Sequence, residues 1–263
     1  MKVAVCLVGQ YRQFDYTFPI WNIDSNIDVD YFVSTWNISS ELRKYIYKDV
    51  DTFEFKKESP NGLKYNSEKN HFFQKITESK IKKNLPYANI KIYDSRYQSK
   101  NNHVNMVFLM KSCIDMIGDM DYDYILILRF DSALYLKNDI ENLKKDVLYH
   151  SGFYRTSPEF EKFNINDIYW VGGSNLIKKF VKGMYSTFDI PHIHIANYIY
   201  ENKFKEDELN HIRITSPWRP ATIPFLKKCI DERKNGFNYW HNLESSTHEI
   251  LTIQNHIGSL PFN

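Results

Sequence analysis

The sequence predicts an α/β protein with a mostly parallel central sheet flanked by helices, folded as a single domain. Two apolar runs, residues 3–8 and 124–130, are hydrophobic on both faces, which is typical of strands buried in the middle of such a sheet. Residues 102–116 carry apolar side chains at helical spacing, so a helix is expected before the second of these strands. At 263 residues the chain is long enough to bury one large core.

The first third of the chain predicts a strand-helix-strand unit. The strand at residues 3–8 ends at Gly9, as a buried strand does before a tight turn. Residues 29–36 are rich in β-branched and aromatic side chains and are expected to form the second strand. A short helix is expected within residues 11–25, although Pro19 limits where it can run.

The segment that follows has weaker patterns. Residues 38–65 show no sustained period and are interpreted as an excursion from the sheet. Residues 67–84 have the apolar spacing of an amphipathic helix that stops before Pro86. A short strand is then expected at residues 90–93.

The carboxyl-terminal half is expected to alternate the same kinds of element. We expect a strand at 167–171, a turn at Gly172 and Gly173, helices at 175–185 and 192–200, a short strand at 212–214 and a last amphipathic helix at 223–232.

Composition excludes several classes of protein. Lys and Arg number 34 against 32 acidic residues, so the net charge of +2 provides no broad basic field, and no nucleic-acid partner is expected. The run at residues 3–8 is too short for a signal-peptide core or a membrane span, so a cytoplasmic protein is expected. Cys6, Cys113 and Cys229 have no zinc or disulfide spacing and are expected to be reduced core residues.

Polar residues follow the first predicted strand where a ligand would be expected. In open α/β sheets ligands bind at the carboxyl ends of the strands. Gly9, Gln10, Tyr11 and Arg12 stand there; the glycine allows close backbone approach, and the arginine can pair with a phosphate. A plain turn with a surface arginine explains the same residues equally well.

The strand at residues 124–130 ends in a second polar group. Arg129 and Asp131 are two residues apart, so they point to the same side of the sheet. A charge pair at the end of an apolar strand is costly to bury, which favours a functional role. The alternative is that Asp131 pairs with Arg129 structurally or caps a helix near Asp139. Asp121 and Asp123 lie at the amino end of the strand and are expected to be solvated turn residues.

A third candidate group follows the strand expected at 167–171. Asp167 offers a carboxylate, Trp170 a flat ring, and Gly173 and Ser174 a flexible turn before a helix amino terminus. A glycine turn that only redirects the chain deserves equal weight.

Four short segments, taken in order, resemble one known family. They are VAVCLVGQYR at 3–12, DVDYFVSTW at 28–36, YDYILILRFD at 122–131 and the Gly-Gly-Ser of 172–174. This series is similar to that of bacterial and viral nucleotide-sugar transferases of the GT-A type. In those proteins a Gly-Gln-x-Arg turn follows the first strand, a strand ending in Thr-Trp comes next, and Arg-x-Asp ends the central strand. The segments span about two thirds of the chain, and their order carries the resemblance.

The resemblance implies a GT-A-like, Rossmann-like domain that moves a sugar from a nucleotide-diphosphate donor, such as a UDP- or GDP-sugar, to a glycan or glycoconjugate acceptor. It would act in the cytoplasm, or in the host cytoplasm if the source is viral. About residues 1–135 would form the donor half and about 136–263 the acceptor half. The implied donor-binding residues are Gly9, Gln10, Tyr11, Arg12, Thr35, Trp36, Lys111 and Arg129.

The resemblance also implies a metal site and catalytic residues. Asp131 matches the first aspartate of the family's Asp-x-Asp motif, which makes it the implied catalytic ligand of Mg²⁺ or Mn²⁺. The second aspartate is missing, because Ser132 and Ala133 follow. Neutralisation of the diphosphate by Arg12, Arg129 or Lys111 therefore stays open as an alternative to a metal.

Acceptor contacts are implied in the second half of the chain. Asp167 is the implied general base or acceptor contact. Trp170, Gly173, Ser174 and Trp218 are the implied acceptor-binding residues, and the alternative for the two tryptophans is packing in the core.

Two other functions fit parts of the pattern. A Rossmann-type methyltransferase has a similar series of strands, but no GxGxxG turn follows the first strand here. A glycan-binding protein that kept the fold and lost the chemistry would account for the missing second aspartate.

Overall fold

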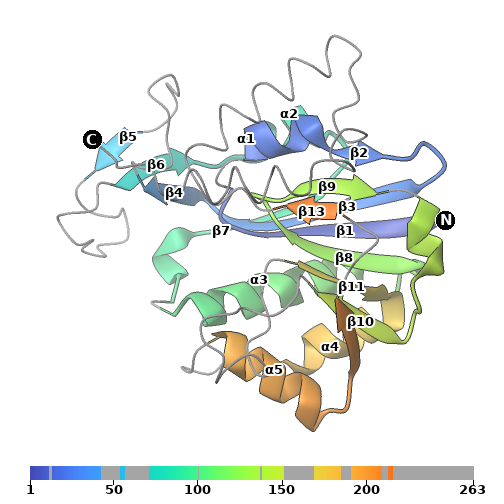
Figure 1. The fold of residues 1–263 in the computed structure, drawn as a ribbon. Helices are drawn as coiled ribbons and strands as arrows, with labels where there is room; N and C mark the ends of the chain where they lie inside the picture. Colours follow the sequence, from blue (N-terminus) through green and yellow to red (C-terminus); the bar gives the residue numbers. More distant parts are fainter. Residues whose placement is uncertain are drawn as a thin grey trace, which may run out of the picture.

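A computed structural model describes residues 1–11, 14–42, 54–56, 71–99, 101–136, 138–150, 169–184, 191–208 and 213–215. Its centre is a seven-stranded sheet with helices on one face and a mixture of short helices and strands on the other (Figure 1). Among the described residues no helix is long and apolar enough to cross a membrane.

The central sheet has the order β12-β10-β11-β8-β1-β3-β7. Strand β1 is parallel to β3 and to β8, β3 is parallel to β7, and β10 is parallel to β12. Only β11 among these strands runs antiparallel to its neighbours. This mostly parallel sheet confirms the predicted α/β class and is consistent with a Rossmann-like fold. The strands are β1 (Lys2–Gly9), β3 (Asp28–Trp36), β7 (Asn89–Tyr93), β8 (Tyr124–Arg129), β10 (Val147–His150), β11 (Tyr169–Gly173) and β12 (Lys205–Glu208).

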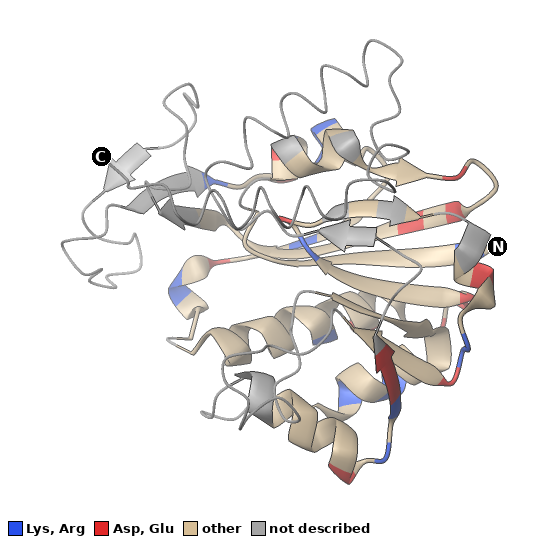
Figure 2. Cartoon of the chain, viewed as in Figure 1, with Lys and Arg blue, Asp and Glu red and all other residues tan. Residues whose placement is uncertain are grey.

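The two middle strands are buried on both faces, as their sequence predicts. Val3, Val5 and Leu7 of β1 belong to one hydrophobic cluster, and Ala4 and Cys6 belong to the cluster on the opposite face. Figure 2 shows these strands largely uncharged along their length, with charged residues near their ends. In these two strands, charged side chains therefore lie only at the ends.

Three helices cover one face of the sheet (Figure 1). They are α3 (Asn102–Ile117), α4 (Ser174–Gly183) and α5 (Pro191–Glu201). Helix α3 begins where the Asn101 side chain accepts hydrogen bonds from the amides of His103 and Val104, and it ends at Gly118, whose φ of 55° suits glycine. All three helices agree with predicted ones to within two residues at each end.

The other face is covered by shorter elements. Helix α1 (Phe14–Thr17) runs into the 3-10 turn η1 (Phe18–Ile20), and α2 (Glu78–Asn84) lies nearby. A small sheet of order β13-β9-β2 lies on the same side. It contains β2 (Asn22–Ile23), β9 (Ala133–Leu136) and β13 (Arg213–Thr215). The remaining elements are β4 (Ile38–Leu42), β5 (Glu54–Lys56), β6 (His71–Lys75), η3 (Ser95–Tyr97) and η4 (Asn138–Asn142).

Two predicted helices are shorter than expected. Residues 71–75 form strand β6, which pairs with β4 and β5, so the helix predicted from residue 67 begins only at Glu78. The pairing of β6 with its neighbours outweighs the helical spacing of the apolar residues there. Thr77 is the N-cap residue of helix α2, and its side chain accepts a hydrogen bond from the Lys80 amide at 3.3 Å. Within residues 11–25, the helix has four residues and gives way to η1, which contains Pro19.

The predicted turn at Gly172 and Gly173 is wrong. Both residues belong to strand β11. A Cβ at Gly173 would lie 2.6 Å from the Lys145 carbonyl oxygen, and one at Gly172 would lie 3.2 Å from that of Val147. The two glycines therefore permit close approach of a neighbouring backbone and do not reverse the chain.

Several other predictions can be placed. Strand β13 overlaps the strand predicted at 212–214, but it pairs with β9 in the small sheet. Cys6 and Cys113 are free and buried, as expected. Cys229, the predicted helix at 223–232 and the first part of the strand predicted at 167–171 lie outside the described residues.

Candidate functional site

The order of the strands singles out one position at the edge of the sheet. From β1 the chain passes to β3 and β7 on one side, and then to β8 on the other side of β1. The carboxyl ends of β1 and β8 therefore flank a topological switch point, where open α/β sheets bind ligands. Val8 and Arg129 are register partners, so the turns that follow the two strands lie next to each other.

The turn after β1 has a conformation that requires glycine. Gly9 has a φ of 103°, and no atom of the described residues lies within 4 Å of the position of a Cβ, apart from its chain neighbours, so the space beside it is open on their side. Its carbonyl oxygen accepts a hydrogen bond of 2.7 Å from the hydroxyl of Thr35, its register partner on β3. Thr35 is buried and fixes this turn from the neighbouring strand.

The turn after β8 contains a buried ion pair. The Arg129 guanidinium donates from Nε to Oδ1 of Asp131 at 3.0 Å and from Nη2 to Oδ2 at 2.6 Å. The side chains are 15% and 6% exposed, respectively. This is the pairing considered in the structural alternative, and it also fixes the plane of the guanidinium at the switch point.

Two side chains from the α1–η1 segment hold the backbone of this second turn. The Thr17 hydroxyl donates to the Phe130 carbonyl at 2.8 Å, and the Trp21 indole donates to the Ser132 carbonyl at 2.9 Å. The Ser132 amide donates to the Arg129 carbonyl at 3.0 Å, which closes the turn. Asp131 is therefore carried on a backbone fixed from both sides, as precise positioning of a functional group requires.

Aromatic packing joins the two turns. Tyr11 and Phe130 are both fully buried, and their ring centroids are 5.4 Å apart. The Tyr11 hydroxyl donates to Asp15 at 2.6 Å and accepts from Asn84 at 3.3 Å. Burial raises the pKa of Tyr11 well above its usual value, and the Asp15 carboxylate adds to this effect, so the hydroxyl stays protonated. In this structure the buried ring of Tyr11 packs against Phe130 and so supports the two turns.

The structure thus brings together Gly9, Gln10, Tyr11, Thr35, Arg129 and Asp131, as a site at the carboxyl ends requires. Two other implied donor residues do not join this group. Trp36 ends β3 at the same carboxyl edge, but its ring is buried on the α3 side, stacked on Phe108 with centroids 5.9 Å apart. Lys111 lies nine residues into α3, about 13 Å along the axis from its first residue and away from the carboxyl ends.

The implied acceptor residues of β11 are not brought to this site. Because β11 is antiparallel to β8, Gly173 pairs with Tyr124, the first residue of β8, and Ser174 follows at the same edge. That edge is roughly 17 Å from Arg129, the length of a six-residue strand. Trp170 is 1% exposed and lies against His150 and Phe180, so it is a core residue.

Three of the implied site residues cannot be placed relative to these strands. Arg12, Asp167 and Trp218 lie outside the described residues. Their implied roles stay predictions.

Sequence reasoning missed several residues near the site. Thr17 and Trp21 have no local signal, because their partners are more than 100 positions away in the chain. Away from the site, His150 at the end of β10 is buried beside Trp170, and its Nε2 lies 2.8 Å from a carboxylate oxygen of Glu206. Only strand pairing brings that histidine and that glutamate together.

The contacts of Asp131 bear on the implied metal. Both of its carboxylate oxygens are engaged by Arg129, and the described part of the chain contains no group of three His, Cys, Asp or Glu side chains arranged to hold a metal ion. The described residues around Asp131 thus do not fit a divalent-cation site while Arg129 is in place. Metal binding by Asp131 stays a prediction.

The hydroxyl of Thr17 provides a test of how the turn is held. Thr17→Val keeps the shape of the side chain but leaves the buried Phe130 carbonyl without this donor, so we expect the free energy of unfolding to fall by about 1–3 kcal/mol. Chemical denaturation measures the change. Ser79→Ala, at a position exposed on α2, is the control and should change stability by less than about 0.5 kcal/mol. Equal stability of Thr17→Val and the original protein would contradict the assigned role.

Comparison with known proteins adds no assignment. No protein-family model matches the chain, and no curated protein is similar to it at a significant level. The function must therefore be inferred from the fold and from the geometry at the carboxyl ends of β1 and β8.

Proposed function

We propose that this protein is a glycosyltransferase with a GT-A-like fold, which binds a nucleotide-diphosphate sugar at the carboxyl ends of β1 and β8 and transfers the sugar to a glycan or glycoconjugate. The observation that carries the proposal is the Arg129–Asp131 pair at the topological switch point of a mostly parallel sheet. The resemblance of the segments at 3–12, 28–36 and 122–131 to nucleotide-sugar transferases supports the same conclusion.

Arg129 is the proposed ligand of the donor diphosphate. A guanidinium presents five N–H donors in a planar fork that matches phosphate oxygens, and the bond pattern with Asp131 uses Nε and Nη2. The carboxylate thereby sets the plane in which the guanidinium meets its ligand. Positive charge fixed beside the diphosphate would stabilise the nucleotide as it leaves the sugar.

Gly9 is the proposed point of close backbone approach. The open space beside its Cα admits a ligand that a side chain would exclude, and the Thr35 hydroxyl holds the turn in this conformation. The diphosphate would therefore lie between the Gly9 turn and the Arg129 guanidinium.

Asp131 acts in this proposal as a positioning residue for Arg129. Binding of Mg²⁺ or Mn²⁺ by Asp131, which the resemblance implies, would require the ion pair with Arg129 to open first. The ion pair supports a role for Asp131 that does not depend on the metal, because both carboxylate oxygens contact the guanidinium and set its orientation.

The acceptor has to reach the same edge of the sheet as the donor sugar. We therefore propose that the general base and the acceptor contacts come from that edge, where Asp167 and Trp218 stay candidates from the sequence. Gly173 and Ser174 at the opposite edge are not included in the proposal.

Thermal shift and calorimetry with nucleotide sugars test the proposal. We expect a UDP- or GDP-sugar to raise the melting temperature of the full chain, because a ligand that binds only the folded state stabilises it. Arg129→Gln should remove most of this shift. Titrations with and without Mn²⁺ separate the two roles considered for Asp131.

A surface pair in the same chain is a matched control. Arg96 and Asp94 are also two residues apart and form an ion pair, through one carboxylate oxygen, but the Arg96 side chain is 72% exposed and the pair follows the edge strand β7. Arg96→Gln should leave the ligand-induced shift unchanged. Equal shifts in Arg129→Gln and the original protein would remove Arg129 from the site, and a shift with S-adenosylmethionine alone would favour a methyltransferase.

A further inference from the structure

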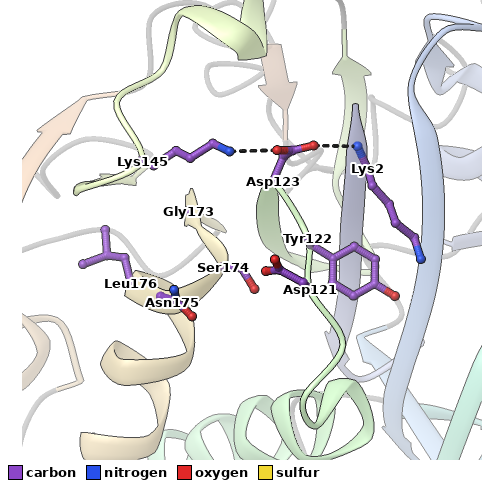
Figure 3. A pocket seen from close by; sticks show the side chains of 9 residues that line it. All are labelled: Lys2, Asp121, Tyr122, Asp123, Lys145, Gly173, Ser174, Asn175 and Leu176. Atoms are coloured by element: carbon purple, nitrogen blue, oxygen red, sulfur yellow. Dashed lines mark hydrogen bonds and ion pairs between the residues drawn. The ribbon is translucent and has the colours of Figure 1, made fainter.

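A pocket of about 330 Å³ lies at the opposite edge of the sheet from the proposed donor site (Figure 3). This volume is at the lower end of the range of small-molecule sites, roughly 300–1,000 Å³. Its walls come from the start of β1, the segment before β8 and the start of α4. The lining residues are Lys2, Asp121, Tyr122, Asp123, Lys145, Gly173, Ser174, Asn175 and Leu176.

The amino terminus of α4 opens into this pocket without a side-chain cap. The first amides of a helix have no partner within the helix, and a cap residue usually supplies an acceptor. Gly173 occupies the cap position of this ten-residue helix and makes no such bond. A Cβ there would lie 2.6 Å from the Lys145 carbonyl oxygen, so none of the usual capping side chains fits.

The Ser174 hydroxyl is a second hydrogen-bond donor at the same place, and it too lacks an acceptor among the described residues. Ser174 is 4% exposed and lines the pocket, and its Oγ has no hydrogen-bond partner among the residues that the structure describes. Figure 3 shows its side chain directed from α4 toward the segment that contains Asp121 and Asp123. A buried hydroxyl without a partner is costly, and an acceptor placed at the helix start would satisfy both the hydroxyl and the first amides.

The charges around the pocket are partly cancelled within the protein. Asp123 accepts from the Lys145 ammonium at 2.7 Å and from the Lys2 amide at 2.9 Å. The hydrogen bond from Lys145 is the main reason that the pKa of Asp123 is lowered, and the same bond raises the pKa of Lys145. Asp121 is the remaining acidic residue of the lining, and it is exposed.

We propose that this pocket is a binding site for a small oxyanion, a phosphate or carboxylate group, held by the Ser174 hydroxyl and the first amides of α4. The helix dipole favours negative charge at that point, and Lys145 stands at the pocket wall. The site is separate from the proposed donor site, because β8 spans the distance between them. Its occupation does not depend on the proposed transferase activity.

Two substitutions have opposite expected effects on affinity. Ser174→Ala removes the buried donor and should weaken oxyanion binding about tenfold. Asp121→Asn removes a like charge from the lining and should strengthen binding about two- to fivefold. A cation site or a site for a neutral sugar predicts the reverse for Asp121→Asn, because the carboxylate would then be an attractive group.

Nuclear magnetic resonance titration of the full chain at constant ionic strength measures these effects, with inorganic phosphate, acetate and chloride as separate ligands. We expect saturable shifts of the Ser174 and Asn175 amides with phosphate or acetate. The anion that binds more tightly shows whether the site prefers a phosphate or a carboxylate group. Matched controls are Ser34→Ala, another buried hydroxyl without a partner, and Asp119→Asn, an exposed acid outside the pocket.

Three outcomes would overturn the inference. They are no saturable shift with either anion, a loss of affinity in Asp121→Asn, and equal losses in Ser174→Ala and Ser34→Ala. Amide spectra of each variant without ligand show whether the fold is kept, and Asp121→Asn remains informative if Ser174→Ala fails to fold.

Discussion

Asp131→Asn is expected to lower turnover with a nucleotide-sugar donor by at least about a hundredfold, as the loss of a group that positions transition-state charge does in other enzymes. Asparagine keeps the size and shape of the side chain but carries no negative charge. The Arg129 guanidinium can then keep only one of its two hydrogen bonds to this side chain, of 3.0 and 2.6 Å, and the bidentate contact that sets its orientation is lost. Steady-state kinetics with saturating donor measure the effect.

Stability measured on the same variant separates catalysis from structure. If the pair serves only the fold, Asp131→Asn weakens a buried ion pair whose arginine is 15% exposed, the protein should lose up to several kcal/mol, on the order of 3–5 for a buried pair, and the folded protein keeps its turnover. If the pair also orients Arg129 for the donor, turnover falls about a hundredfold even in protein that is folded at the assay temperature. Full activity in a folded Asp131→Asn protein would contradict the proposed role of Asp131 in positioning Arg129.

The surface pair again supplies the control. Asp94→Asn removes the same charge from an arginine partner two residues away, at a place where the Arg96 side chain is 72% exposed. We expect it to leave turnover within a factor of about two and stability within about 1 kcal/mol. A hundredfold loss in Asp94→Asn would show that the charge change acts through something other than the switch point.

Phe130→Ala is expected to give the largest loss of stability, about 3–5 kcal/mol. Phe130 is fully buried, and its ring centroid lies 5.4 Å from that of Tyr11 and 5.3 Å from that of Phe14. Truncation removes this contact area and leaves a cavity between the two turns that form the site. Urea denaturation of the variant and the original protein measures the difference.

An exposed aromatic residue provides the comparison for this loss. Tyr97 is 81% exposed at the same edge of the sheet, and Tyr97→Ala should change stability by no more than about 0.5 kcal/mol. If Phe130→Ala cost as little as Tyr97→Ala, the packing that joins the turns after β1 and β8 would have no energetic importance.

Part of the candidate site could be predicted from the sequence because its signals are local. Gly9 follows an unbroken apolar run, and Arg129 and Asp131 end another, so both groups were expected at the carboxyl ends of buried strands. The parallel pairing of β1 with β8 brings them together. The supports at Thr17 and Trp21 could not be predicted, because a hydrogen bond to a backbone carbonyl leaves no pattern in either segment.

The sequence by itself determined which segments are buried and, for most of them, which type of element they form. The apolar runs at 3–8 and 124–130 and the helical spacing at 102–116 are properties of neighbouring residues, and burial follows from them directly. Only the tertiary structure decided the direction of β11, and with it the edge on which Gly173 and Ser174 lie. Hydrophobic pattern repeats along a strand in the same way whichever direction the strand runs, so it specifies burial but not orientation.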